Sequence, residues 1–101
     1  MENKKKFAFI LMGAHYEPEK HHADFETWKQ ITRICTVNDY EEAKKLVVEL
    51  KESGFGAVEL CGAFGQEKAK ELAELTEHKV AVGYIVHDAD MDELFAGFFG
   101  R

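Results

Sequence analysis

The chain has 101 residues, of which 46% are hydrophobic, and its formal net charge is −6 at pH 7. This length and composition predict one globular domain and exclude an intrinsically disordered chain. The excess of acidic residues argues against nucleic acid as a partner, because a negatively charged protein repels the phosphate backbone.

The start of the chain shows neither a membrane span nor a signal peptide. No apolar run approaches the roughly 20 residues that cross a bilayer. The apolar run at residues 7–14 has no small-residue cleavage site after it, so we interpret residues 1–6 as a charged leader before a first strand. The two cysteines, Cys35 and Cys61, suit a reducing compartment. We therefore expect a single domain over residues 1–101, located in the cytoplasm, with no membrane partner.

The first half of the chain predicts two strands separated by a loop. Residues 7–15 form a continuous apolar run, which is typical of a strand buried on both faces. Residues 16–29 are polar and hold the only proline, Pro18, so we predict an irregular loop. Residues 30–37 alternate in polarity and contain β-branched side chains, which predicts a second strand.

Residues 38–54 carry the strongest helical pattern. Asn38 is the expected N-cap, with Glu41 as the acid of a capping box and Gly54 as the C-cap. The side chains expected to face the core follow helical spacing: Ala43, Leu46, Val47 and Leu50.

The second half of the chain continues the alternation of strands and helices. Residues 56–62 predict a third strand, residues 64–79 a second helix and residues 79–88 a fourth strand. Residues 88–100 predict a third helix with Asp90 as its N-cap. This last helix carries a bulky apolar stripe: Leu94, Phe95, Phe98 and Phe99.

The element order β-β-α-β-α-β-α predicts an α/β fold with a four-stranded, mostly parallel sheet and helices on at least one face. Helices between consecutive strands imply right-handed crossovers. If strands two to four are neighbours in chain order, two helices lie on the same face and the other face needs a cover. We expect that cover from the Phe-rich C-terminal segment or from a second copy, and we favour a homodimer or larger homo-oligomer.

Chemically active side chains follow three of the predicted strands. Parallel sheets bind ligands beyond the carboxyl ends of their strands, and these ends carry His15, Cys61 and His87, with Glu59 and Asp88 close by. If the first strand is parallel to the others, these three side chains share one rim of the sheet. The period of two in a strand places Glu59 and Cys61 on one face.

Three kinds of site fit this rim. Cysteine, histidine and carboxylate suit zinc, but no tight ligand spacing such as CxxC or HExxH is present, so we predict no metal. Cys61 is a candidate nucleophile, with His15 or His87 as its base. The turn from Gly62 to Gly65 is a candidate anion site, because a helix N-terminus offers free N–H groups.

Each of these residues also has a purely structural interpretation. A buried cysteine is commonly a small hydrophobic side chain. Gly62 and Gly65 can simply form the turn into the next helix. Glu59 can face water at a sheet edge or form an ion pair with Arg33.

Four stretches of this sequence together carry a resemblance: FAFILMG, AVELCGAFG, VAVGYIVHD and DELFAGFF. With them the chain resembles a family of small prokaryotic proteins of about this length, classed as a domain of unknown function. The resemblance covers residues 7–99. It implies no activity and assigns no role to any residue.

We expect an uncharacterised small protein that binds a small ligand or an anion at the carboxyl ends of the strands. The candidate ligand-binding residues are Glu59, Cys61, Gly62, Gly65, His87 and Asp88. Two alternatives stay open: a small enzyme that uses Cys61 or a bound metal with His15 and His87, and a structural protein that only self-associates. The sequence does not decide whether the chain is an enzyme, and it identifies no cofactor.

Overall fold

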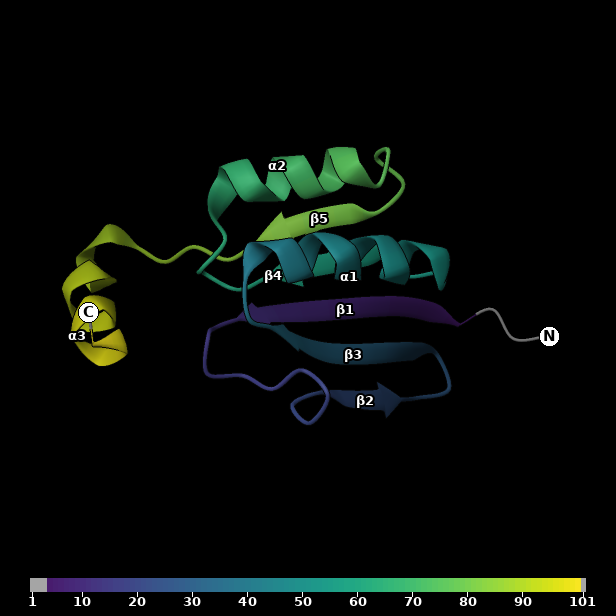
Figure 1. Cartoon of the computed structure of the whole chain (residues 1–101), viewed down its shortest axis with the longest axis horizontal. Helices are drawn as coiled ribbons and strands as arrows, with labels where there is room; N and C mark the ends of the chain where they lie inside the picture. The colour runs from purple at the N-terminus through teal and green to yellow at the C-terminus, as the bar shows by residue number, and fades with distance from the viewer. Residues whose placement is uncertain (1–3, 101) are drawn as a thin grey trace.

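The computed structural model describes residues 4–100 and shows a five-stranded sheet in the order β2-β3-β1-β4-β5 (Figure 1). The central strand β1 (Lys5–Met12) is parallel to β3 (Gln30–Val37) on one side and to β4 (Ala57–Leu60) on the other. β5 (Ala81–Tyr84) continues parallel beyond β4. The mostly parallel α/β sheet is confirmed, whereas the predicted number of strands was one too low.

The extra strand, β2 (Ala23–Glu26), lies inside the segment that the sequence predicts as a loop, and it pairs antiparallel with β3. All four of its residues are exposed, and the alternation of Ala23 and Phe25 with Asp24 and Glu26 is too short to predict a strand. Its pairing is supported instead by two hydrogen bonds that Arg33 donates to the Asp24 carboxylate, at 2.8 and 3.0 Å.

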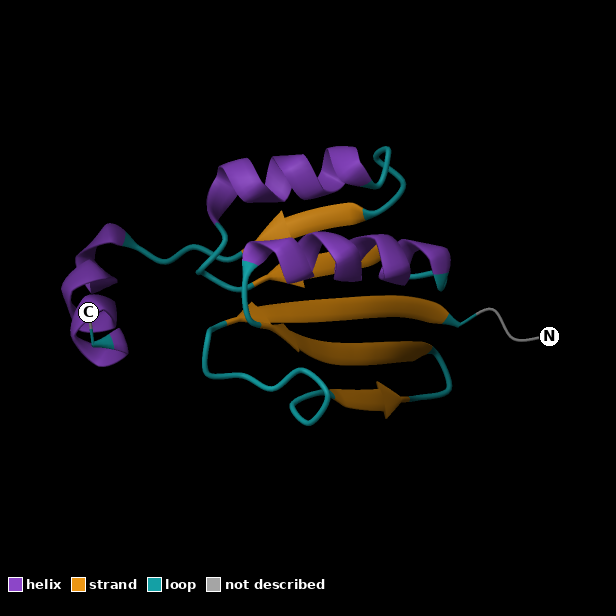
Figure 2. Ribbon diagram, viewed as in Figure 1, coloured by secondary structure: helices purple, strands orange, loops and turns teal. Residues whose placement is uncertain are grey.

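Both longer helices cover the same face of the sheet (Figure 2). α1 (Tyr40–Glu52) connects β3 to β4, and α2 (Gly65–Leu75) connects β4 to β5. They enclose one apolar core, whose largest fully buried apolar side chains are Ile10, Val47, Val58, Leu60 and Leu72. The prediction that both helices share a face is confirmed, although β1 lies between β3 and β4 and the strands do not follow chain order.

The cap of α1 is shifted by one residue from the prediction. The N-cap is Asp39, whose Oδ1 accepts a hydrogen bond from the Glu42 N–H at 2.9 Å. The Glu42 carboxylate in turn accepts from the Asn38 N–H at 2.6 Å. The arrangement resembles a capping box, except that Glu42 accepts from the residue before the N-cap. Asn38 and Glu41 were the wrong pair, because both Asn38 and Asp39 are good caps and the sequence does not choose between them.

The second face of the sheet, which we call the open face, has no helix over it. Strand alternation and register place on it the side chains opposite to the core positions Ala8, Ile10, Val58 and Leu60. Its apolar members and glycine are Phe7, Phe9, Leu11, Ile34, Ala57, Ala81 and Gly83, and its polar members are Lys5, Gln30, Thr32, Thr36 and Glu59. Thr36 is buried and donates a hydrogen bond to the His21 carbonyl. The face is thus mainly apolar, with one carboxylate near its middle.

The last helix, α3 (Asp92–Phe99), follows a short 3-10 turn, η1 (Ala89–Met91), and lies beyond the carboxyl ends of the strands (Figure 1). None of its residues is buried. The exposed fractions of Leu94, Phe98 and Phe99 are 70%, 81% and 76%. The predicted apolar stripe is therefore present, but within one chain it covers nothing.

The boundaries of the elements differ modestly from the predictions. β1 begins at Lys5, inside the predicted leader, and residues 1–3 of that leader lie outside the described residues. β4 and β5 are shorter than predicted because their ends turn into the rim described below. Within residues 4–100, no helix has the length and apolar character needed to cross a bilayer.

The capping geometry predicts that Asp39→Ala lowers the free energy of unfolding by about 1 kcal/mol, because the Glu42 N–H loses its acceptor. Urea unfolding followed by circular dichroism measures this change. Glu52→Ala, at the exposed last residue of the same helix, is the matched control and should change stability by less than about 0.5 kcal/mol. Equal losses in both variants would contradict the capping role.

Candidate functional site

The carboxyl ends of β1, β4 and β5 meet at one rim of the sheet, because the three strands are parallel. Backbone hydrogen bonds extend the pairing past the strand ends. The Cys61 N–H donates to the Ile10 carbonyl and the Ile85 N–H to the Leu60 carbonyl, each at 3.0 Å. The segments that carry Cys61 and His87 therefore leave the sheet side by side.

The side chains at this rim nevertheless contact local partners. The His15 ring packs on Tyr16, with 4.2 Å between ring centroids. His87 stacks on Phe95 at 4.2 Å, and its Nε2 lies 2.7 Å from Asp92 Oδ1. No hydrogen bond or ring contact joins His15, Cys61 and His87 to one another among residues 4–100.

Cys61 has a structural environment. Its sulfur accepts a hydrogen bond from the Met12 N–H at 3.4 Å, and the side chain packs against the core. Over the part of the chain that the structure describes, no group of three or more His, Cys, Asp or Glu side chains could hold a metal ion.

The turn from Gly62 to Gly65 leads into α2. Gly65 has φ +81°, a conformation that favours glycine, while a Cβ at this position would meet no atom within 4 Å. The helix begins after Phe64 without a side-chain cap. The glycine is thus explained by the turn, and the first N–H groups of α2 remain available to an acceptor.

Glu59 lies on the open face, between Phe9 of β1 and Gly83 of β5. A Cβ at Gly83 would lie 2.5 Å from Glu59 Oε1, so the glycine leaves the space that the carboxylate occupies. The predicted shared face with Cys61 is wrong, because Cys61 turns toward the core after the strand ends.

The Glu59 carboxylate also lacks a partner within the described chain. Arg33, the partner considered from the sequence, lies on the opposite face and binds Asp24. No hydrogen bond or ion pair connects Glu59 to any of residues 4–100. Glu59 and the exposed Asp88 are therefore the members of the predicted ligand-binding set whose carboxylates have no partner within residues 4–100, and only Glu59 lies within the sheet.

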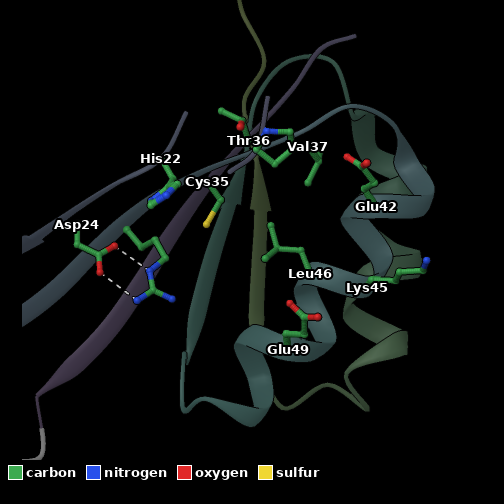
Figure 3. A pocket seen from close by; sticks show the side chains of 11 residues that line it. His22, Asp24, Cys35, Thr36, Val37, Glu42, Lys45, Leu46 and Glu49 are labelled. Atoms are coloured by element: carbon green, nitrogen blue, oxygen red, sulfur yellow. Dashed lines mark hydrogen bonds and ion pairs between the residues drawn. The ribbon is translucent and has the colours of Figure 1, made fainter. Parts of the chain in front are cut away.

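A groove that the sequence analysis missed lies on the helix-covered side, between α1 and β3 (Figure 3). Its volume is about 470 Å³. Cys35, Val37 and Leu46 form an apolar floor, and charged side chains form the rim: His22, Asp24, Arg33, Glu42, Lys45 and Glu49. The sequence feature that indicates this groove is Arg33. It shares a strand face with the buried Cys35 and Val37, and a charged side chain on that face indicates where the helices no longer cover the sheet.

Two of the charged side chains at the groove, Asp24 and Arg33, form an ion pair with each other. The hydrogen bonds from Arg33 hold the pKa of the Asp24 carboxyl below its usual range and raise the pKa of Arg33 in return. Burial raises the pKa of the Cys35 thiol to about 11, so this sulfur is protonated at neutral pH. The groove can hold an amphipathic molecule, but it offers no activated nucleophile.

Residues 5–100 match the model of a family of unknown function, DUF6506. The chain belongs to this family. The match confirms the resemblance to a domain of unknown function that the sequence predicts. A search of the curated proteins found no match, and a search of the solved structures found none either. Membership in DUF6506 therefore assigns no function to this chain and no role to any of its residues.

The contact between Glu59 and Gly83 predicts a coupled effect on stability. Gly83→Ala places a methyl group in the space of the Glu59 carboxylate, so the end of that flexible side chain must move, and the free energy of unfolding should change by less than about 0.5 kcal/mol. In a Glu59→Ala background the same change should raise the free energy of unfolding by roughly 0.5 kcal/mol, because the space is empty and alanine is more stable than glycine within a strand. A double-mutant cycle from urea unfolding gives the coupling energy; additive effects would show that the two side chains do not share this space.

The buried thiol predicts a pH-dependent labelling rate. In a Cys61→Ser variant, Cys35 should react slowly with iodoacetamide at pH 8, and its rate should rise about tenfold per pH unit until the pH nears its pKa of about 11. A plateau below pH 9 would contradict the effect of burial. The Cys35→Ser variant is the control, and unusually fast labelling of its remaining Cys61 would support the enzyme alternative.

Proposed function

We propose that the protein acts as a homodimer that binds a small ligand between its two copies, with Glu59 as the anchoring group. The observation that supports this function is the open face itself. It is apolar and uncovered, and it carries one carboxylate in a space shaped by Gly83.

The need for a second copy follows from the exposed apolar area. Soluble monomers rarely expose contiguous apolar patches of more than a few hundred Å². Here Phe7, Phe9 and Leu11 form a ridge along the central strand of the open face. A chain of 101 residues has a small core, so covering this ridge with a symmetry-related copy adds stability that one chain lacks.

The need for a ligand follows from Glu59. Taking an ionised carboxylate out of water without a partner costs several kcal/mol. A two-fold dimer brings both Glu59 side chains into the same interface and makes this cost larger. A ligand with an ammonium, amidine or hydroxyl donor on an apolar body would satisfy the carboxylate and fit the apolar surroundings. The same charge disfavours an anion at this position.

The enzyme alternative has less support. A nucleophilic Cys61 needs a base within hydrogen-bonding reach, whereas His15 contacts Tyr16 and His87 contacts Asp92 and Phe95. The sulfur itself accepts a backbone hydrogen bond. Binding through Glu59 requires no such rearrangement.

Native mass spectrometry of the protein purified from cells tests this function. We expect a dimer that retains a small additional mass. Glu59→Leu should keep the dimer, since an apolar side chain fits the interface at least as well, and should lose the additional mass. Glu67→Leu, an equal change at an exposed position of α2, is the control and should retain it.

Two results would contradict the proposal in different ways. A wild-type dimer without additional mass, unchanged by Glu59→Leu, would leave only structural self-association. A monomer at micromolar concentration would remove the second copy and with it the enclosed site.

A further inference from the structure

The C-terminal helix α3 is an ordered element without a core. It packs substantially only against the adjacent η1, and none of its residues is buried. A helix of 8 residues is not stable by itself in water. Two of its aromatic side chains nevertheless contact each other: the rings of Phe98 and Phe99 pack edge to face, with 5.1 Å between their centroids. Such a helix requires a surface that covers its apolar side.

His87 fixes the start of this unit. Its ring stacks on Phe95 and its Nε2 meets Asp92, so residues 87–99 behave as one piece. Only Ile85 and Val86 remain between this piece and β5. Both are β-branched and favour extended backbone, and neither is a residue that allows a sharp reversal. The helix therefore lies beyond the carboxyl ends of the strands and does not pack on the sheet of its own chain (Figure 1).

The open face offers a matching seat. Beside Phe7, the amino-terminal ends of β4 and β5 present only the small side chains of Ala57 and Ala81, and the Glu59 and Gly83 pair of the ligand site lies two residues further along these strands. A row of small residues next to a ridge forms a shallow trough that accepts the bulky side chains of a helix.

The charges of the two surfaces are complementary. The segment that leads into and begins α3 carries four acids and no lysine or arginine: Asp88, Asp90, Asp92 and Glu93. At the opposite end of the sheet a hollow of about 490 Å³ is lined by Lys4, Lys5 and Lys6 together with Phe7 and Ala57. Lys4 already forms an ion pair with Glu26 and Lys6 donates to the Ser53 carbonyl, so Lys5 is the lysine without a partner among residues 4–100. A two-fold axis perpendicular to the strands brings the carboxyl end of one sheet over the amino end of the other, and so places these opposite charges together.

We propose that two copies exchange their C-terminal helices, each α3 seated on the open face of the other copy with its acidic start at the lysine-lined hollow. This inference rests on the proposed dimer and goes further, because it names the element that makes the contact. Aromatic side chains bury about 150–250 Å² each, so two exchanged helices and the faces under them bury on the order of 1,500 Å², enough for a stable dimer.

Complementation between two variants of the full chain tests the exchange. Phe98→Asp damages the helix, and Ala81→Glu blocks the trough. Both positions are exposed in the single chain, so both variants should keep the wild-type circular dichroism spectrum. Each variant alone should dimerise at least tenfold more weakly than wild type. Their mixture should form a heterodimer, since one intact helix then meets one intact face.

Native mass spectrometry distinguishes the heterodimer from both homodimers by mass. Leu75→Asp, an exposed apolar position on α2, is the control and should dimerise as wild type does. A mixture that stays monomeric, or a Phe98→Asp variant that dimerises normally, would overturn the exchange while leaving the dimer and the Glu59 site standing. A monomeric wild type would overturn both proposals.

Discussion

The handedness of the two crossover connections determines most of this structure. The chain moves across the sheet in the same direction twice, from β3 over β1 to β4 and then to β5. Because parallel crossovers are right-handed, both steps place their helices on one face. The opposite face can then be covered only by something outside these two units. Three features follow from that one-sided arrangement: the apolar ridge of β1 is not covered by a helix, Glu59 has no partner within the described chain, and α3 does not pack on the sheet.

The sequence predicts those helices and strands in which buried apolar side chains alternate regularly with exposed polar ones. β3 and the core side of α1 were found because Cys35, Val37, Ala43, Val47 and Leu50 repeat with the period of their element and are buried. β2 was not found, because it has only four residues, all exposed, and its pairing with β3 depends on backbone hydrogen bonds and on an ion pair between Asp24 and Arg33. The position of β1 between β3 and β4 was likewise hidden, since no local pattern encodes which strands become neighbours.

For the candidate site as well, one part was predictable from the sequence and another was not. The rule that ligands bind beyond the carboxyl ends of parallel strands placed the segments of His15, Cys61 and His87 at one rim. It could not predict where their side chains turn, because each finds a partner within a few residues or in the backbone: Tyr16, Met12 and Asp92. Glu59 differs because its neighbour, Gly83, is a residue with no side chain.

The presence of that carboxylate argues that the open face of the proposed dimer has a role beyond self-association. An interface selected for stability alone gains from an apolar side chain at its centre, since burying a charge costs more than it returns unless the charge is paired. Glu59 stands where a leucine would pack against Phe9, and Gly83 gives up a side chain of its own to make room for it. At both Glu59 and Gly83, a larger apolar side chain is thus absent and one negative charge is accommodated instead. A partner for that charge, brought by a ligand rather than by the chain, is the simplest account of both.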